Sequence, residues 1–79
     1  MDTLERVRKI AAEKMGVSED QVTPQASLKN DFAADSLTMM EIIMELEEAF
    51  CMEFGEEALE LGTAQQFADY VETKWRNEK

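Results

Sequence analysis

The chain has 79 residues, with 8 basic and 18 acidic side chains and a net charge of -10. This length predicts a single domain over 1–79. One cysteine excludes an intrachain disulfide, and the lack of histidine argues against a metal site. The negative charge repels the phosphates of nucleic acids and anionic lipid headgroups, so neither nucleic acid nor membrane is expected as a partner.

The sequence also favours an all-helical protein. Three glycines and one proline provide few turns for an all-β chain. A small domain without disulfides or metal closes its core most readily by packing helices. No apolar run approaches the ~20 residues that span a bilayer, and the first residues do not resemble a signal peptide. A cytoplasmic location is therefore expected.

The first predicted helix covers 3–15. Asp2 is placed to cap it, with Glu5 completing a capping box, and Gly16 is placed to end it. Its apolar residues recur at helical spacing and are Leu4, Val7, Ile10, Ala11 and Met15. The segment 17–34 then reads as a long connection. Within it, Ser18 and Gln21 can cap one short turn, and Pro24 breaks any continuation.

The second predicted helix starts at Asp35 or Ser36 and ends near Cys51. Apolar residues cover most of its circumference, while Thr38, Glu41, Glu45 and Glu48 share one arc. This pattern predicts a mostly buried central helix with a narrow acidic stripe. Cys51 is expected to be a buried small hydrophobic residue.

Two further helices follow. A short one is predicted over 56–61, after Gly55, and a final one begins at Thr63 with Gln66 at the capping-box position. The final helix has apolar or amphipathic residues at helical spacing, namely Phe67, Tyr70, Val71, Lys74 and Trp75. The predicted fold is a small four-helix bundle of three longer helices and one short helix, with a long loop between the first two.

Ser36 is the candidate functional residue. A catalytic serine needs a base within hydrogen-bond reach, usually an imidazole or a lysine, and this chain has no histidine. Acidic neighbours also make the hydroxyl harder to deprotonate. From residue type alone, an ordinary helix cap is the favoured interpretation, and a site of covalent attachment is the alternative. A phosphate attached there would face the free N–H groups of the helix start.

The residues around Ser36 resemble those of an acyl carrier protein, and the similarity covers nearly the whole chain. The strongest segment is Asp31-Phe32-Ala33-Ala34-Asp35-Ser36-Leu37, followed by Glu41 and Leu46-Glu47-Glu48-Ala49-Phe50. The resemblance implies that Ser36 carries a 4′-phosphopantetheine arm, derived from coenzyme A, whose thiol holds acyl groups as thioesters. It implies that Asp35 helps a phosphopantetheinyl transferase to recognise the site and that Leu37 packs near the base of the arm.

The same resemblance assigns roles to the second helix. Glu41, Glu45 and Glu48 are expected to dock onto basic patches of acyl-transferring and acyl-modifying enzymes, and such contacts weaken in salt. Met39 and Met40 are expected to influence the choice of partner. Met40 and Met44 are expected to line an acyl pocket, since methionine adapts its shape to irregular space. The expected protein is a monomeric carrier in fatty-acid or related biosynthesis, not an enzyme.

Several positions depart from the family pattern. Ala33 stands where glycine is usual, and Thr38 stands where an acid is common. Met39 and Met40 replace smaller or β-branched residues. These differences leave open a specialised carrier, for polyketide synthesis or lipid modification, instead of one that serves the housekeeping fatty-acid pathway.

Two other functions compete with a carrier. One is an acidic helical interaction module without a prosthetic group, in which Ser36 only caps a helix. The other is a small hydrolase that uses Ser36, which would require a lysine-type base nearby because histidine is absent.

Overall fold

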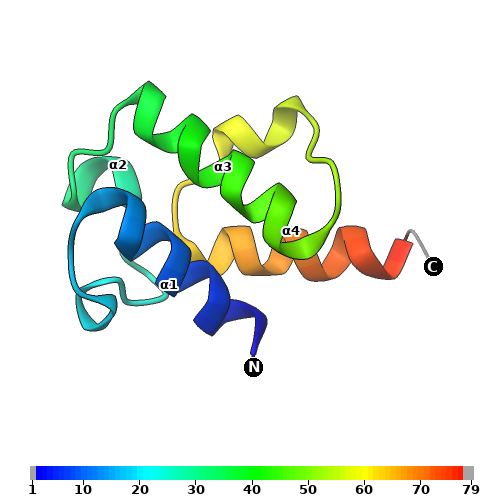
Figure 1. The fold of residues 1–79 in the computed structure, drawn as a ribbon, viewed down its shortest axis with the longest axis horizontal. Coiled ribbons are helices and arrows are strands. Elements are labelled where there is room, and N and C mark those ends of the chain that lie inside the picture. The colour runs from blue at the N-terminus through cyan, green and yellow to red at the C-terminus, as the bar shows by residue number, and fades with distance from the viewer. Residues whose placement is uncertain (1, 78–79) are drawn as a thin grey trace.

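The computed structural model describes residues 2–77 and is built of helices. Its α-helices are α1 (Thr3–Met15), α2 (Leu28–Asp31), α3 (Ser36–Phe50) and α4 (Ala64–Asn77), and its 3₁₀ turns are η1 (Glu19–Gln21) and η2 (Glu56–Glu60). Between residues 2 and 77 there is no β-strand, only an isolated bridge that joins Ser27 to Thr63. The all-helical prediction is confirmed. In Figure 1, α3 and α4 lie one above the other and α1 crosses beside them.

Helix α1 begins and ends where the sequence predicts. The Asp2 carboxylate accepts a hydrogen bond from the Leu4 N–H at 3.3 Å, and Gly16 ends the helix with φ of 71°. Glycine adopts this left-handed conformation without steric cost. The expected capping box is not formed, because Glu5 makes no hydrogen bond back to Asp2 among the described residues.

The connection between α1 and α3 is more structured than expected. The predicted turn is present, and the Ser18 N–H donates to Gln21 Oε1 at 3.0 Å. The long-loop prediction overlooked α2, which Ser27 caps by accepting from the Asn30 N–H at 3.2 Å. Leu28 begins α2 and is fully buried, so this short helix anchors the connection to the core.

Helix α3 is less enclosed than its sequence suggested. Its main helical neighbour is α1, with η2 beside it, and α4 packs chiefly on α1. Its outer face is consequently open, and Leu37, Met40 and Met44 are 67%, 51% and 60% exposed. The prediction of a mostly buried helix was wrong for this face.

The end of α3 also differs from expectation. Cys51 is exposed and ends the helix with φ of 52°, donating its backbone N–H to the carbonyls of Glu47 and Glu48. Because a residue that reverses the chain in this way projects its side chain beyond the helix, the prediction of a buried Cys51 was wrong.

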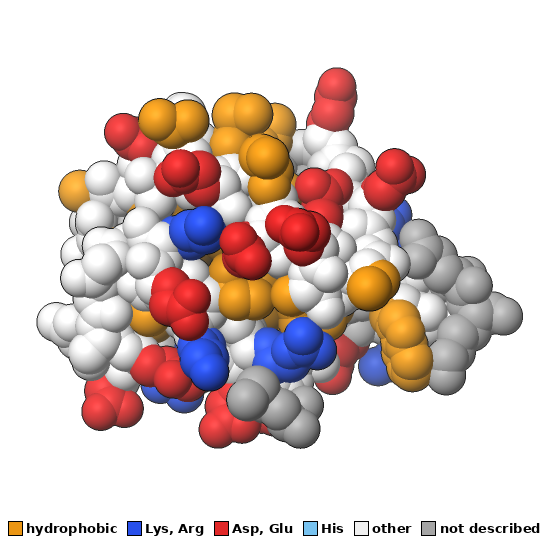
Figure 2. Space-filling model, viewed as in Figure 1, with side chains coloured by type: hydrophobic (Ala, Val, Ile, Leu, Met, Phe, Trp, Pro, Cys, Tyr) orange, Lys and Arg blue, Asp and Glu red, His pale blue; other side chains and the backbone are white. Residues whose placement is uncertain are grey.

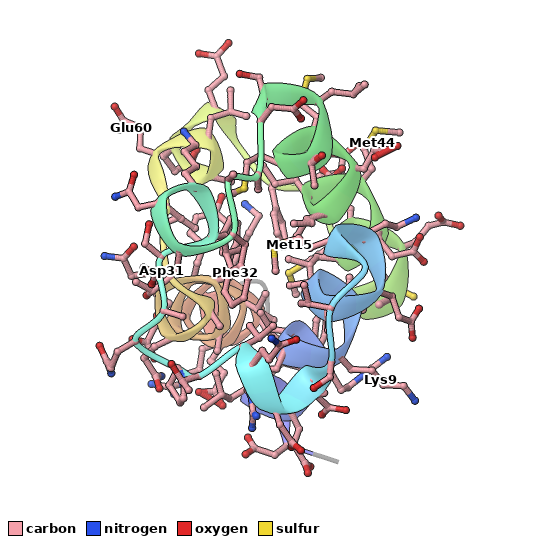
Figure 3. The ribbon with its side chains drawn as sticks, turned by 90° about the vertical axis from the view of Figure 1, so that its left-hand side faces the viewer. Lys9, Met15, Asp31, Phe32, Met44 and Glu60 are labelled. Atoms are coloured by element: carbon pink, nitrogen blue, oxygen red, sulfur yellow. The ribbon has the colours of Figure 1, made fainter. Side chains whose placement is uncertain are left out.

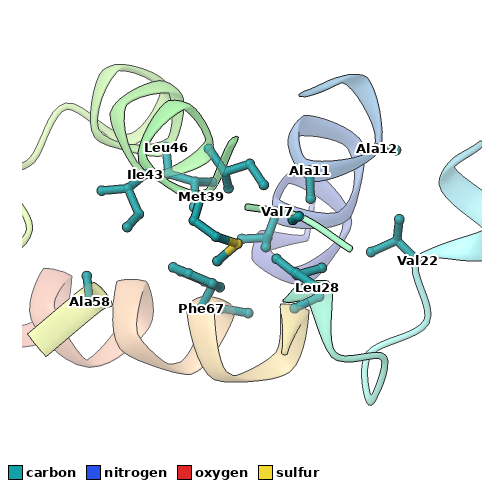
Figure 4. Packing of buried hydrophobic residues seen from close by; sticks show 14 residues of the cluster. Val7, Ala11, Ala12, Val22, Leu28, Met39, Ile43, Leu46, Ala58 and Phe67 are labelled. Carbon is teal, nitrogen blue, oxygen red and sulfur yellow. The ribbon is translucent and has the colours of Figure 1, made fainter. Parts of the chain in front are cut away.

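The core lies where α1, α3 and α4 meet (Figure 4). Its largest fully buried side chains are Phe67, Leu28, Ile42, Leu46, Val7 and Val22. The start of α4 confirms the predicted capping box, with Gln66 N–H donating to Thr63 Oγ1 at 3.1 Å and Thr63 N–H donating to Gln66 Oε1 at 3.2 Å. Within the described residues, no helix is long and apolar enough to cross a membrane.

Candidate functional site

Ser36 is the first residue of α3, and its side chain is exposed. The preceding residue caps the helix: Asp35 Oδ1 accepts a hydrogen bond from the Thr38 N–H at 2.8 Å. No hydrogen bond of residues 2–77 involves the Ser36 hydroxyl. Ser36 is therefore not the cap of this helix, and its hydroxyl is available to a reagent in solvent.

The Asp35 carboxylate is held in its ionised form. The hydrogen bond from the Thr38 backbone, together with one from the Thr38 side chain, lowers the pKa of Asp35 below its ordinary value. Asp35 therefore carries a full negative charge at neutral pH, beside Ser36 and beneath the positive end of the α3 dipole. This charge disfavours an alkoxide at Ser36.

The geometry gives no support to the hydrolase alternative. A nucleophilic serine requires a base within hydrogen-bond reach, and no side chain among the described residues hydrogen-bonds to the Ser36 hydroxyl. The same described residues contain no group of three or more metal-ligating side chains.

Ala33 brings the chain into the start of α3 through a left-handed turn. Its φ is 54°, which glycine adopts freely and alanine adopts at a steric cost. The next residue, Ala34, is buried and donates its N–H to the Leu28 carbonyl at 3.2 Å, so the turn is held against α2. This backbone geometry gives a physical reason for the glycine that the family pattern has at the position of Ala33.

The variant Ala33→Gly is expected to raise the free energy of unfolding by about 0.5–1 kcal/mol. Glycine removes the clash of Cβ at φ of 54°, and part of this gain is offset by the greater entropy of the unfolded chain. Urea unfolding followed by circular dichroism measures the change. Ala34→Gly is the matched control and is expected to destabilise the fold, because Ala34 is buried and does not have a positive φ. Destabilisation by Ala33→Gly would contradict this account.

The acidic stripe on α3 is exposed but is not uniformly free. Glu41 and Glu48 are exposed, while Glu45 is half-exposed and forms an ion pair of 3.3 Å with Lys14 of α1. Figure 2 shows several acidic side chains across this face of the molecule. Of the three predicted docking carboxylates, Glu41 and Glu48 thus have no ion-pair partner among the described residues, and Glu45 is paired with Lys14 of α1.

Met39 lies elsewhere than predicted. It is 3% exposed and packs in the core between Phe67 and the side chains of α1 and α3 (Figure 4). A partner protein cannot contact a side chain that is enclosed in this way, so its assignment to a docking surface was wrong. Met40, the next residue around the helix, is exposed and remains a candidate for that role.

Met40 and Met44 lie together along a shallow groove of about 230 Å³ between α3 and η2. The groove is also lined by Ile43, Glu47, Phe54, Gly55, Glu56 and Leu59. Glu47 fixes one wall by accepting a hydrogen bond from the Phe54 N–H at 2.9 Å. The sequence did not assign Phe54 and Leu59 to this groove, because they belong to a segment whose position relative to α3 depends on the fold.

Comparison with known proteins identifies the family of the chain. The family model described as a phosphopantetheine attachment site matches residues 5–71. An acyl carrier protein from Rubrobacter xylanophilus is 48% identical over 71 residues, which are 89% of this chain and 88% of the relative. A solved structure reported under the high thermal stability of acyl carrier protein from Enterococcus faecalis superposes with a TM-score of 0.74 at 36% identity, covering 90% of this chain and 95% of the other.

The family model, the related sequence and the solved structure each match most of the chain. The match therefore covers the helical fold and includes the segment around Ser36. The interaction module without a prosthetic group is not favoured by these similarities. The chain belongs to the acyl carrier protein family and carries acyl intermediates on a covalently attached 4′-phosphopantetheine arm.

Proposed function

We propose that Ser36 is the residue that bears the arm. The observation that carries this proposal is the exposed Ser36 hydroxyl, which lacks a hydrogen-bond partner among the described residues because Asp35 caps α3 in its place. The free N–H groups at the helix start favour a phosphate at this position. In attachment, the Ser36 oxygen attacks the phosphorus that bears the pantetheine in coenzyme A and gives up its proton to a base that the transferase supplies. The new P–O bond replaces the pyrophosphate bond, which breaks, and adenosine 3′,5′-bisphosphate leaves.

The arm supplies the thiol that holds an acyl group as a thioester. The residues of this chain present the arm, and the reactions on the acyl group belong to partner enzymes. We therefore infer that this chain is not itself an enzyme. The absence of a base at the Ser36 hydroxyl within the described residues supports this inference.

The test of the attachment site combines two mass measurements. The apo protein is incubated with coenzyme A and a broad-range phosphopantetheinyl transferase, and its intact mass is expected to rise by one arm. Fragmentation of the modified peptide is expected to place the addition on Ser36. An addition on another residue, or no addition, would overturn the proposal.

We further propose a docking surface made of Glu41, Glu45, Glu48 and Met40. Exposed carboxylates attract a basic partner over a distance and act mainly on the association rate. Met40 is exposed and adds an apolar contact at the edge of this surface that borders the groove. Lys14 shields Glu45 through their ion pair, so Glu41 and Glu48 are expected to dominate the attraction.

Reversing the charge in Glu41→Lys/Glu48→Lys is expected to slow modification of Ser36 by about tenfold at low salt. The difference is expected to shrink as salt screens both proteins. The measurement is the initial rate of arm transfer at several salt concentrations. Glu5→Lys/Glu72→Lys is the matched control, with the same change of net charge at exposed positions of α1 and α4. Equal slowing in both double variants would show that net charge, and not the docking surface, sets the rate.

Met40 and Met44 are proposed to shelter the acyl chain in the groove between α3 and η2. Fatty-acid biosynthesis is the usual role of the family. The specialised alternatives in polyketide synthesis or lipid modification depend on partners that recognise Thr38 and Met40. A single carrier unit over 1–79, a monomeric state and a cytoplasmic location stay predictions.

A further inference from the structure

Four of the methionines in residues 2–77 form two pairs that differ sharply in exposure, and Met15 is intermediate between them. Met40 and Met44 are 51% and 60% exposed, whereas Met39 and Met52 are 3% and 8% exposed. Met39 and Met40 are adjacent in sequence and lie in the same turn of α3, but they lie about 100° apart around the helix and so have different environments. Figure 3 shows Met44 at the outer edge of α3. The thioethers that solvent reaches most readily are therefore those of the groove.

The surroundings of the exposed pair select the kind of reagent that reaches it. Glu41, Glu45 and Glu48 lie on the same helix, and the chain has a net charge of -10, so anionic oxidants are repelled. A neutral hydroperoxide is not repelled. Both sulfur atoms border the open groove, which such a small molecule can enter from solvent.

We propose that Met40 and Met44 are oxidation sites through which a hydroperoxide switches off the docking and acyl-sheltering surface of α3. In each reaction the methionine sulfur attacks one peroxide oxygen and the O–O bond breaks. A new S–O bond forms, the sulfur is oxidised by two electrons, and the peroxide is reduced to water or an alcohol. A thiol-dependent methionine sulfoxide reductase reverses the change.

The consequence follows from the polarity of the product. A sulfoxide is polar, whereas the thioether it replaces is flexible and apolar. Oxidation at both positions therefore replaces two apolar side chains of one wall of the groove, and at Met40 it also removes the apolar contact of the docking surface, without disturbing the buried Met39 and Met52. This consequence rests on the proposed function of the α3 surface, whereas the choice of oxidation sites rests on exposure alone.

The first test maps the oxidation sites on the apo protein. Cys51→Ser is used as background, because the Cys51 thiol is exposed and would also consume peroxide. After limited treatment with hydrogen peroxide, tandem mass spectrometry is expected to show oxidation of Met40 and Met44 about tenfold faster than that of Met39 and Met52. Circular dichroism confirms that the fold is intact. Equal rates at all four positions, or faster oxidation of the buried pair, would overturn the proposal.

The second test measures transfer of the arm to Ser36. Peroxide treatment is expected to slow this transfer about fivefold, and the reductase is expected to restore it. In the Met40→Leu/Met44→Leu background the transfer rate is expected to be the same before and after treatment. If the untreated protein accepts the arm and oxidation at both sites leaves its rate unchanged, the switch is wrong. If the untreated protein accepts no arm at Ser36, the attachment proposal fails instead.

Discussion

Replacing Ser36 by alanine is expected to abolish attachment of the phosphopantetheine arm. The Ser36 oxygen is the atom that forms the phosphodiester in the proposed site, and alanine has no atom that can replace it. After incubation with coenzyme A and the transferase, the intact mass of Ser36→Ala is expected to equal that of the untreated variant. The wild-type chain is expected to gain one arm under the same conditions.

The variant is also expected to keep the native fold, which makes the loss interpretable. The Ser36 hydroxyl makes no hydrogen bond among the described residues, and Asp35 continues to cap α3. The free energy of unfolding is therefore expected to change by less than about 0.5 kcal/mol. Ser18→Ala, at another exposed serine, is the control and is expected to accept one arm. An arm on Ser36→Ala would show that another residue is the acceptor.

Helix boundaries were the features most accessible from sequence, because the groups that set them lie within four residues of one another. Asp35 and Thr38, and likewise Thr63 and Gln66, form their cap hydrogen bonds locally. Gly16 ends α1 because glycine takes a positive φ freely. Such contacts are nearly independent of the tertiary fold, so residue type and spacing predict them.

Helix α2 was missed because its position depends on contacts far along the chain. Only four residues long, it lacks the repeated apolar spacing that identifies a helix. The Leu28 N–H donates to the Gly62 carbonyl at 2.9 Å, and Ser27 forms a bridge with Thr63. These partners precede α4, and no pattern within 17–34 reveals them.

The exposure of α3 shows a second limit of periodicity. The spacing of its apolar residues identifies a broad apolar arc but does not tell how many neighbours cover that arc. Met39 and Met40 are about 100° apart around the helix, and only Met39 meets the core. The groove next to Met40 is also lined by Phe54 and Leu59. These two residues follow α3 in sequence, and the chain folds back after α3 to place them beside it. Ser36 is proposed as the attachment residue from its motif alone, whereas the description of its surroundings requires the fold.

Phe67→Ala is expected to bring the domain close to global unfolding. Phe67 is fully buried in the core, beside Met39 and opposite α1 (Figure 4). Truncating a buried phenylalanine costs about 3–5 kcal/mol, through lost apolar burial and the cavity left behind. A chain of 79 residues has a total stability of roughly 4–12 kcal/mol at the usual value per residue. The loss is therefore a large share of the total, and urea unfolding followed by circular dichroism measures it.

Two further variants keep this prediction testable when Phe67→Ala does not fold. Phe67→Leu retains most of the apolar volume and is expected to cost less than Phe67→Ala, at about 1–1.5 kcal/mol. Leu59→Ala removes a side chain that is 51% exposed and is expected to change stability by less than about 0.5 kcal/mol. An apolar side chain stabilises the fold in proportion to the area that it removes from water. An equal loss of unfolding free energy in Leu59→Ala and Phe67→Leu would therefore contradict the placement of the core.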